Sequence, residues 1–182
     1  PHEPEKVSNM LSIRRVLIPL AMAVLALTVL PAQAQEAAFS AKLTGASQLP
    51  EPTASKATGE LKLVVATDGK KIAYTLTVQN LRNPSASDMH LGPDSANGPA
   101  VVKLFPVLGA AAKKGDFSGV LSEGTITAGD LAGPMLGSPL ADLIEQIRDG
   151  NTYVNVHTDD GTPPANSGPG DYQLGEIRGQ IK

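Results

Sequence analysis

Three side chains of this sequence have the chemistry of metal ligands. His90 and Asp88 are two residues apart, and His157 follows much later in the chain. Two imidazoles and a carboxylate, with a water molecule, would suit Cu(II) or Zn(II). The alternative is that each histidine is an ordinary polar residue at a strand end. From residue types alone we favour that alternative, because the motifs with closely spaced ligands are missing.

A second polar group is expected beside these residues. Asn155 and His157 alternate with valines, so both should lie on the face opposite the apolar one, which we expect to be the more solvent-exposed face. Glu176 and Arg178 share a face of the last expected strand. If the two strands pair, Asn155, Glu176 and Arg178 form a cross-strand polar cluster near His157.

Other reactive constellations are missing from the sequence. It has no G-x-S-x-G, H-E-x-x-H, P-loop or G-x-G-x-x-G motif. It has no cysteine, which excludes a thiol nucleophile and a zinc–thiolate site. Asp94 with Asn97, or Asp159 with Asp160, could bind calcium, but neither spacing matches a defined calcium loop, and a solvated loop is the favoured interpretation. We therefore predict a protein that is not an enzyme.

The elements that must position these residues are mostly strands. Residues 60–67 and 70–79 are two β-rich runs separated by Asp68-Gly69, the dipeptide typical of a two-residue type I′ hairpin. In the second run, apolar and polar residues alternate, which indicates an antiparallel strand with one buried face.

The rest of the domain continues the pattern of short strands between turns. One short helix is expected near residues 138–149, with Ser138 as N-cap, Pro139 at the first helical position and Gly150 at its end. Residues 117–121 and 124–127 are expected to pair across a turn. The other expected strands are residues 37–43, 87–91, 100–105, 151–158 and 173–181. About eight strands at this spacing predict an all-β fold, an antiparallel Greek-key sandwich or barrel.

The N-terminal segment has the order of a secretory signal. Arg14 and Arg15 follow Met10 and precede an apolar run over residues 16–30, and Ala32-Gln33-Ala34 supplies a cleavage motif. A membrane-spanning helix would need roughly 20 apolar residues, and this run is shorter. We expect an upstream extension over residues 1–9, a signal peptide over 10–34 and a mature domain over 35–182, secreted or periplasmic, with no stable membrane anchor after cleavage.

Composition limits the partners of that domain. The chain has a net charge of −3, and the basic residues after the signal are adjacent only in the two pairs Lys70-Lys71 and Lys113-Lys114. Nucleic acid is therefore not an expected partner, because phosphate binding needs a basic patch. Aromatic residues make up 3% of the chain and tryptophan is absent, which leaves little for stacking against sugars. We expect a protein or cell-surface partner that the sequence does not identify.

Four segments resemble the chordin (CHRD) domain. They are residues 39–46 (FSAKLTGA), 97–102 (NGPAVV), 153–158 (YVNVHT) and 175–181 (GEIRGQI), and the resemblance covers essentially residues 39–182. It implies an immunoglobulin-like or superoxide-dismutase-like sandwich that occurs as an extracellular module, as in bacterial exported single-domain members.

The resemblance also bears on the histidines. The family usually carries His-x-His where this chain has Asp88-Met89-His90, so His90 and His157 match a copper-site pattern and Asp88 departs from it. Three hypotheses follow. We favour a non-catalytic binding or structural module. The alternatives are a copper- or zinc-binding module and an enzyme related to Cu/Zn superoxide dismutases, which two imidazoles are too few to support.

Overall fold

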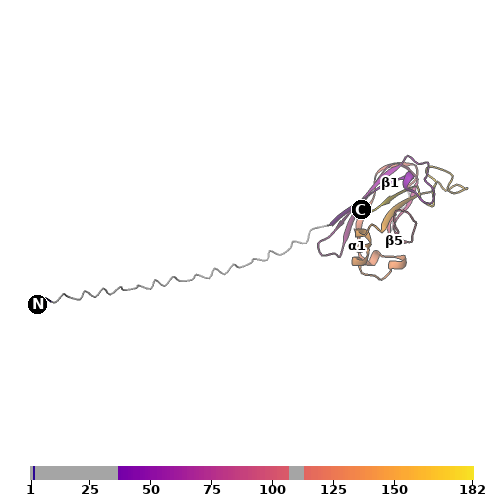
Figure 1. Ribbon diagram of the computed structural model, residues 1–182. Coiled ribbons are helices and arrows are strands. Elements are labelled where there is room, and N and C mark those ends of the chain that lie inside the picture. Colours follow the sequence, from indigo (N-terminus) through magenta and orange to yellow (C-terminus); the bar gives the residue numbers. More distant parts are fainter. Residues whose placement is uncertain (1, 3–36, 107–112) are drawn as a thin grey trace. The chain divides into compact units, whose positions relative to one another are not determined.

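The computed structural model describes His2, residues 37–106 and residues 113–182 (Figure 1). The chain divides into two units, Pro1–Gln33 and Ala34–Lys182, and every strand and helix described below belongs to the second. The expected signal peptide lies outside the described residues. So does most of the loop between the strands that end at Phe105 and begin at Asp116.

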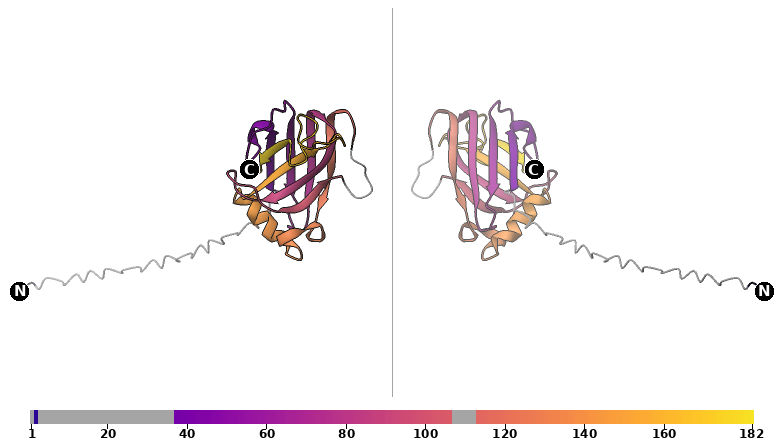
Figure 2. Two further views of the ribbon diagram at one scale, coloured as in Figure 1. Left: turned by 90° about the vertical axis from the view of Figure 1, so that its right-hand side faces the viewer. Right: turned by 90° about the vertical axis from the view of Figure 1, so that its left-hand side faces the viewer.

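The domain is one antiparallel sheet that curls on itself (Figure 2). Its order is β5-β4-β7-β8-β1-β2-β3-β6, and the sheet is nearly closed into a barrel. The strands are β1 (Ala37–Thr44), β2 (Thr58–Val65), β3 (Ile72–Arg82), β4 (Pro84–Leu91), β5 (Ala100–Phe105), β6 (Asp116–Ile126), β7 (Thr152–Thr158) and β8 (Ile177–Gln180). The all-β prediction is confirmed.

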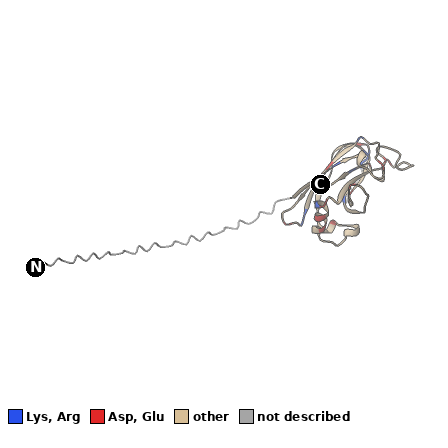
Figure 3. Cartoon of the chain, in the orientation of Figure 1, with Lys and Arg blue, Asp and Glu red and all other residues tan. Residues whose placement is uncertain are grey.

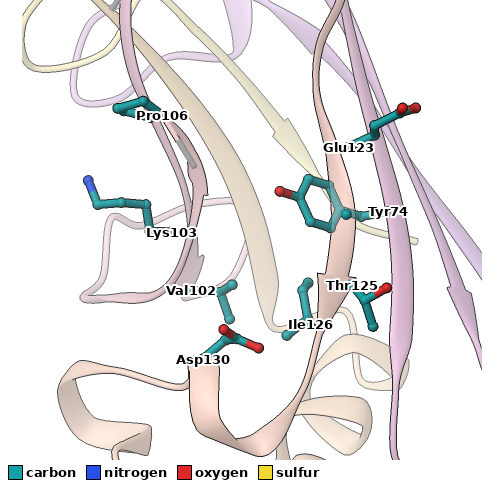
Figure 4. Close-up of a pocket in the computed structure, with 9 residues that line it drawn as sticks. Tyr74, Val102, Lys103, Pro106, Glu123, Thr125, Ile126 and Asp130 are labelled. Atoms are coloured by element: carbon teal, nitrogen blue, oxygen red, sulfur yellow. The ribbon is translucent and has the colours of Figure 1, made fainter. Parts of the chain in front are cut away.

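Side chains link the two edge strands of this sheet. The Tyr74 hydroxyl of β3 donates to the Leu104 carbonyl of β5 at 3.0 Å, and the Ser122 hydroxyl of β6 donates to the same carbonyl at 2.5 Å. Figure 4 shows the Tyr74 ring between the two edges, beside an open pocket also lined by Lys103 and Glu123. Strands β5 and β6 therefore meet at a seam bridged by hydroxyl groups.

The predicted hairpin forms, but its turn type was wrong. Strands β2 and β3 pair over the whole length of β2. The Ala66 amide donates to the Lys71 carbonyl at 2.9 Å, which leaves a loop of four residues. A type I′ turn needs positive φ at both central residues; only Gly69 has it, at 67°. Asp68 instead accepts the Lys70 amide through its own carboxylate at 2.9 Å, a local turn that needs no left-handed backbone.

Another expected pairing was wrong. Residues 117–121 and 124–127 do not pair with each other; all of them except Thr127 lie within the single strand β6, which pairs with β3. Gly124 is the first residue of the second run that was expected to pair. It lies opposite Tyr74, and a Cβ there would stand 3.0 Å from the Tyr74 ring, so this glycine makes room for an aromatic side chain.

The expected helix is present and shorter at its start. Helix α1 spans Leu140–Arg148, and its N-cap is Pro139, without a side-chain cap. The prediction of Ser138 as N-cap was therefore wrong, while Gly150 ends the helix in the left-handed conformation with φ of 67°. The apolar stripe of α1 is buried at one end of the barrel (Figure 2). It consists of Leu140, Leu143, Ile144 and Ile147.

Candidate metal centre

Strands β4 and β7 position the three candidate ligands on one face of the sheet. Asp88 and His90 alternate with Met89, which is fully buried in the core. Asp88 lies opposite Asn155 in the β4–β7 ladder, and His157 stands two residues further along β7. Because side chains on a strand alternate between faces, His157 falls on the same face as Asp88 and His90.

The structure brings the three ligand atoms together. One potential donor atom from each of Asp88, His90 and His157 lies within 4.8 Å of the other two. The His157 Nε2 atom is 3.9 Å from the Asp88 Oδ2 atom. All three residues are half-buried. Two histidines 67 positions apart in the sequence thus meet because their strands are neighbours.

Backbone carbonyls fix the orientation of both imidazoles. The Nδ1 atom of His90 is 2.9 Å from the Gly98 carbonyl, and the Nδ1 atom of His157 is 3.0 Å from the Gln173 carbonyl. A carbonyl only accepts, so each Nδ1 carries a hydrogen, and in the neutral tautomer that this allows Nε2 holds the lone pair. The His90 Nε2 atom is buried and has no hydrogen-bond partner among the described residues. Metal-bound histidines show this arrangement, with the second ring nitrogen bonded to a carbonyl or carboxylate.

The surroundings of His157 favour its neutral form. Burial lowers the pKa of His157 below its ordinary value, and this effect outweighs the opposing hydrogen bond to Gln173 and the charge of Asp88. A neutral imidazole is the form that binds metal ions. Lys103 of β5 places its Nζ atom 4.0 Å from the Asp88 Oδ1 atom, and its side chain is largely exposed. Asp88 is thus the acidic member of the group and has one cation beside it.

An aromatic stack supports His90 from the side. The rings of His90 and Tyr153 are stacked, with centroids 4.8 Å apart and planes 11° from parallel. The Arg178 guanidinium carbon lies 3.9 Å from the centre of the Tyr153 ring. His90 comes from β4 and Arg178 from β8, the two neighbours of β7 in the sheet. The Tyr153 ring therefore lies between a candidate ligand and a buried cation.

The expected polar cluster exists as a ladder but is not solvent-exposed. Arg178 lies opposite Asn155, and the two side chains and Glu176 are all at most 6% exposed. The expectation of an exposed face was wrong because loops cover it. Glu176 accepts hydrogen bonds from the Ser55 hydroxyl, the Thr158 hydroxyl and the Gly170 amide.

These three polar residues therefore anchor loops and do not join the candidate ligands. The Asn155 side chain is hydrogen-bonded to the side chain of Gln48 at 2.5 Å. Glu176 binds the loop before β2, the end of β7 and the loop before β8 through the three hydrogen bonds given above. The residues that sequence reasoning missed are Gly98 and Gln173. Both act through backbone carbonyls, which no residue type signals.

The sequence of this domain matches a protein-family model. The CHRD domain model matches residues 39–181, which include all eight strands except the first two residues of β1. The chain belongs to the CHRD family. No curated protein and no solved structure matches it. The three candidate ligands of this CHRD domain all lie inside the matched region, and CHRD domains are extracellular-type modules.

Two further observations concern the described part of the chain. Among residues 37–106 and 113–182, no helix has the length and apolar character needed to cross a membrane. Figure 3 shows basic and acidic positions dispersed along this part of the chain. The distribution agrees with the net charge of −3.

Proposed function

We propose that this CHRD domain is an exported, non-catalytic module that binds one copper or zinc ion through His90, His157 and Asp88. One observation carries the proposal: two imidazoles, each held by a carbonyl at Nδ1, leave their Nε2 atoms available as ligands beside one carboxylate. The buried His90 Nε2 atom has lost its water and gained no partner among the described residues, and a metal ion would supply one.

The donor set fits a single ion. Ligand atoms around a tetrahedral zinc at 2.0–2.1 Å stand about 3.4 Å apart, and the three donors now lie within 4.8 Å of one another. Small side-chain rotations would close that gap. Two imidazoles and one carboxylate leave one tetrahedral position for water or for a group from a partner. We infer no dismutase activity, because a dinuclear site needs more imidazoles than this group contains.

We expect the metal to stabilise the domain and His157→Ala to abolish the effect. Untagged protein covering residues 35–182 should bind one equivalent of Cu(II) or Zn(II) in calorimetry. Its free energy of unfolding should rise by about 2.7 kcal/mol at a hundredfold excess of metal over Kd. Lys62→Gln is the control, since Lys62 is an exposed strand residue that pairs with Glu60, outside the group of candidate ligands. A metal response of wild-type size in His157→Ala would refute the assignment, and so would a protein that takes up no metal.

We also propose export with cleavage after Ala34. The order of basic pair, apolar run and Ala-Gln-Ala motif supports it, together with the extracellular type of CHRD domains. Mass spectrometry of the exported protein should find Gln35, or its cyclised form, at the N-terminus. A membrane-bound product that retains residues 16–30 would contradict this prediction.

A further inference from the structure

A second group of acidic side chains lies in the loops that follow β7 and precede β8. Asp159 and Asp160 form the turn after β7, and Asp171 comes from the loop before β8. Two hydrogen bonds hold these segments together. The Thr158 amide donates to the Tyr172 carbonyl at 3.2 Å, and the Tyr172 amide donates to the Thr158 hydroxyl at 2.9 Å. One oxygen from each of the three carboxylates lies within 4.8 Å of the other two.

Asp171 is the unusual member of this group. Its side chain is 2% exposed, and its Oδ2 atom accepts from the Ser167 amide at 2.9 Å and from the Ser167 hydroxyl at 2.8 Å. These bonds lower the pKa of Asp171, and the Asp160 amide adds to the effect, so the ionised carboxylate faces the turn. Its Oδ1 atom is buried without a hydrogen-bond partner among the described residues. An oxygen that has lost water and gained no donor is costly.

The other two carboxylates are pre-arranged by their own turns. Asp159 Oδ1 accepts the Gly161 amide at 2.6 Å, and Asp160 Oδ1 accepts the Thr162 amide at 2.7 Å. Each aspartate therefore has one oxygen committed to the backbone and a second oxygen for a ligand. Lys114 donates from its Nζ atom to the Asp159 carbonyl at 2.9 Å. One lysine beside three carboxylates leaves the group with an excess of negative charge.

We propose that Asp159, Asp160 and Asp171 bind a calcium ion, and this site is independent of the candidate metal centre. Three carboxylates without nitrogen or sulfur donors suit a hard cation. Calcium accepts six to eight oxygen ligands in flexible geometry, so water and loop carbonyls can complete the shell. Magnesium demands near-ideal octahedral geometry and gives up its water reluctantly. The ion would neutralise the group and give Asp171 Oδ1 a partner.

Calcium titration of untagged protein covering residues 35–182 tests the proposal, by calorimetry and by thermal unfolding. We expect one equivalent to bind with Kd of about 10⁻⁴–10⁻³ M, the range of extracellular modules, and to raise Tm. Asp160→Asn should weaken binding at least tenfold and leave the calcium-free Tm almost unchanged, because Asp160 is exposed and the amide can still accept the Thr162 amide.

Asp68→Asn is the matched control. Asp68 is also an exposed turn aspartate that accepts an amide two residues later, but it lies outside the acidic group. It should bind calcium like the wild type. His157→Ala should keep the calcium response, and Asp160→Asn should keep the copper response, so failures of the two sites are distinguishable. If the wild type binds no calcium at concentrations up to about ten times the upper Kd limit, the proposal is overturned. Equal calcium affinity of Asp160→Asn and the wild type would also overturn it.

Discussion

Replacing Arg178 with methionine is expected to lower the free energy of unfolding by about 3 kcal/mol, because hydrogen bonds from a buried charged donor are lost and their acceptors are left unpaired. The Arg178 side chain is 1% exposed. It donates to the carbonyls of Pro93, Asp94 and Ala96 at 3.1–3.3 Å and lies 3.6 Å from the Asp94 carboxylate. Methionine has similar length and no donor, so the loop over residues 92–99 loses its anchor.

Chemical denaturation of both proteins measures this effect. Arg148→Met is the matched control, since Arg148 is exposed in the last turn of α1 and its charge contributes only a few tenths of a kcal/mol or little more to the helix. The free energy of unfolding of Arg178→Lys should lie between those of Arg178→Met and Arg148→Met, because a lysine keeps the charge but cannot bond three carbonyls in a fixed plane. If Arg178→Met unfolds at the denaturant concentration of the wild type, the guanidinium does not hold this loop.

Gly98→Ala is expected to have a comparable effect for a steric reason. A Cβ atom at Gly98 would stand 1.8 Å from the Leu91 carbonyl oxygen, a backbone atom that cannot rotate away. The loop must shift, and such overpacking costs about 3 kcal/mol at the upper end of its usual range. The Gly98 carbonyl also accepts from His90 Nδ1 and from the Tyr153 hydroxyl at 3.2 Å. Displacing it should weaken binding at the candidate metal centre by about tenfold or more, as for other groups that orient metal ligands.

Gly129→Ala separates this effect from a general cost of replacing glycine. A Cβ at Gly129 would meet only the Thr127 hydroxyl at 3.6 Å, an ordinary contact, and the Gly129 backbone is not left-handed. Thermal unfolding and metal calorimetry should therefore find this variant close to the wild type. A Gly98→Ala protein with unchanged Tm and unchanged metal affinity would show that the loop adapts freely and that the carbonyl does not orient His90.

Local patterns in the sequence determined the strands and the helix. Alternation over residues 72–79 predicted which side chains of β3 are buried, because a strand always alternates its faces. The same rule placed Asp88 and His90 on one face of β4. Details that depend on distant residues were predicted wrongly. Residues 117–121 and 124–127 were expected to pair with each other, but their partner is the distant strand β3.

The solvent exposure of the polar face could not be predicted from the sequence either. Asn155 and Arg178 occupy the face expected from strand parity, yet loops from other parts of the chain bury both. Exposure depends on those loops, and their paths are set by long-range hydrogen bonds such as the bond from the Thr53 hydroxyl to the Glu176 carbonyl at 2.7 Å.

The sequence by itself determined the all-β class, the family and the three residue types able to bind a metal. Only the tertiary structure decided that they meet, because the distance between His90 and His157 follows from the place of β4 next to β7 in the sheet. It also decided the tautomers, since the groups that fix them are the carbonyls of Gly98 and Gln173. Every residue has a carbonyl, and only the folded chain determines where each one points.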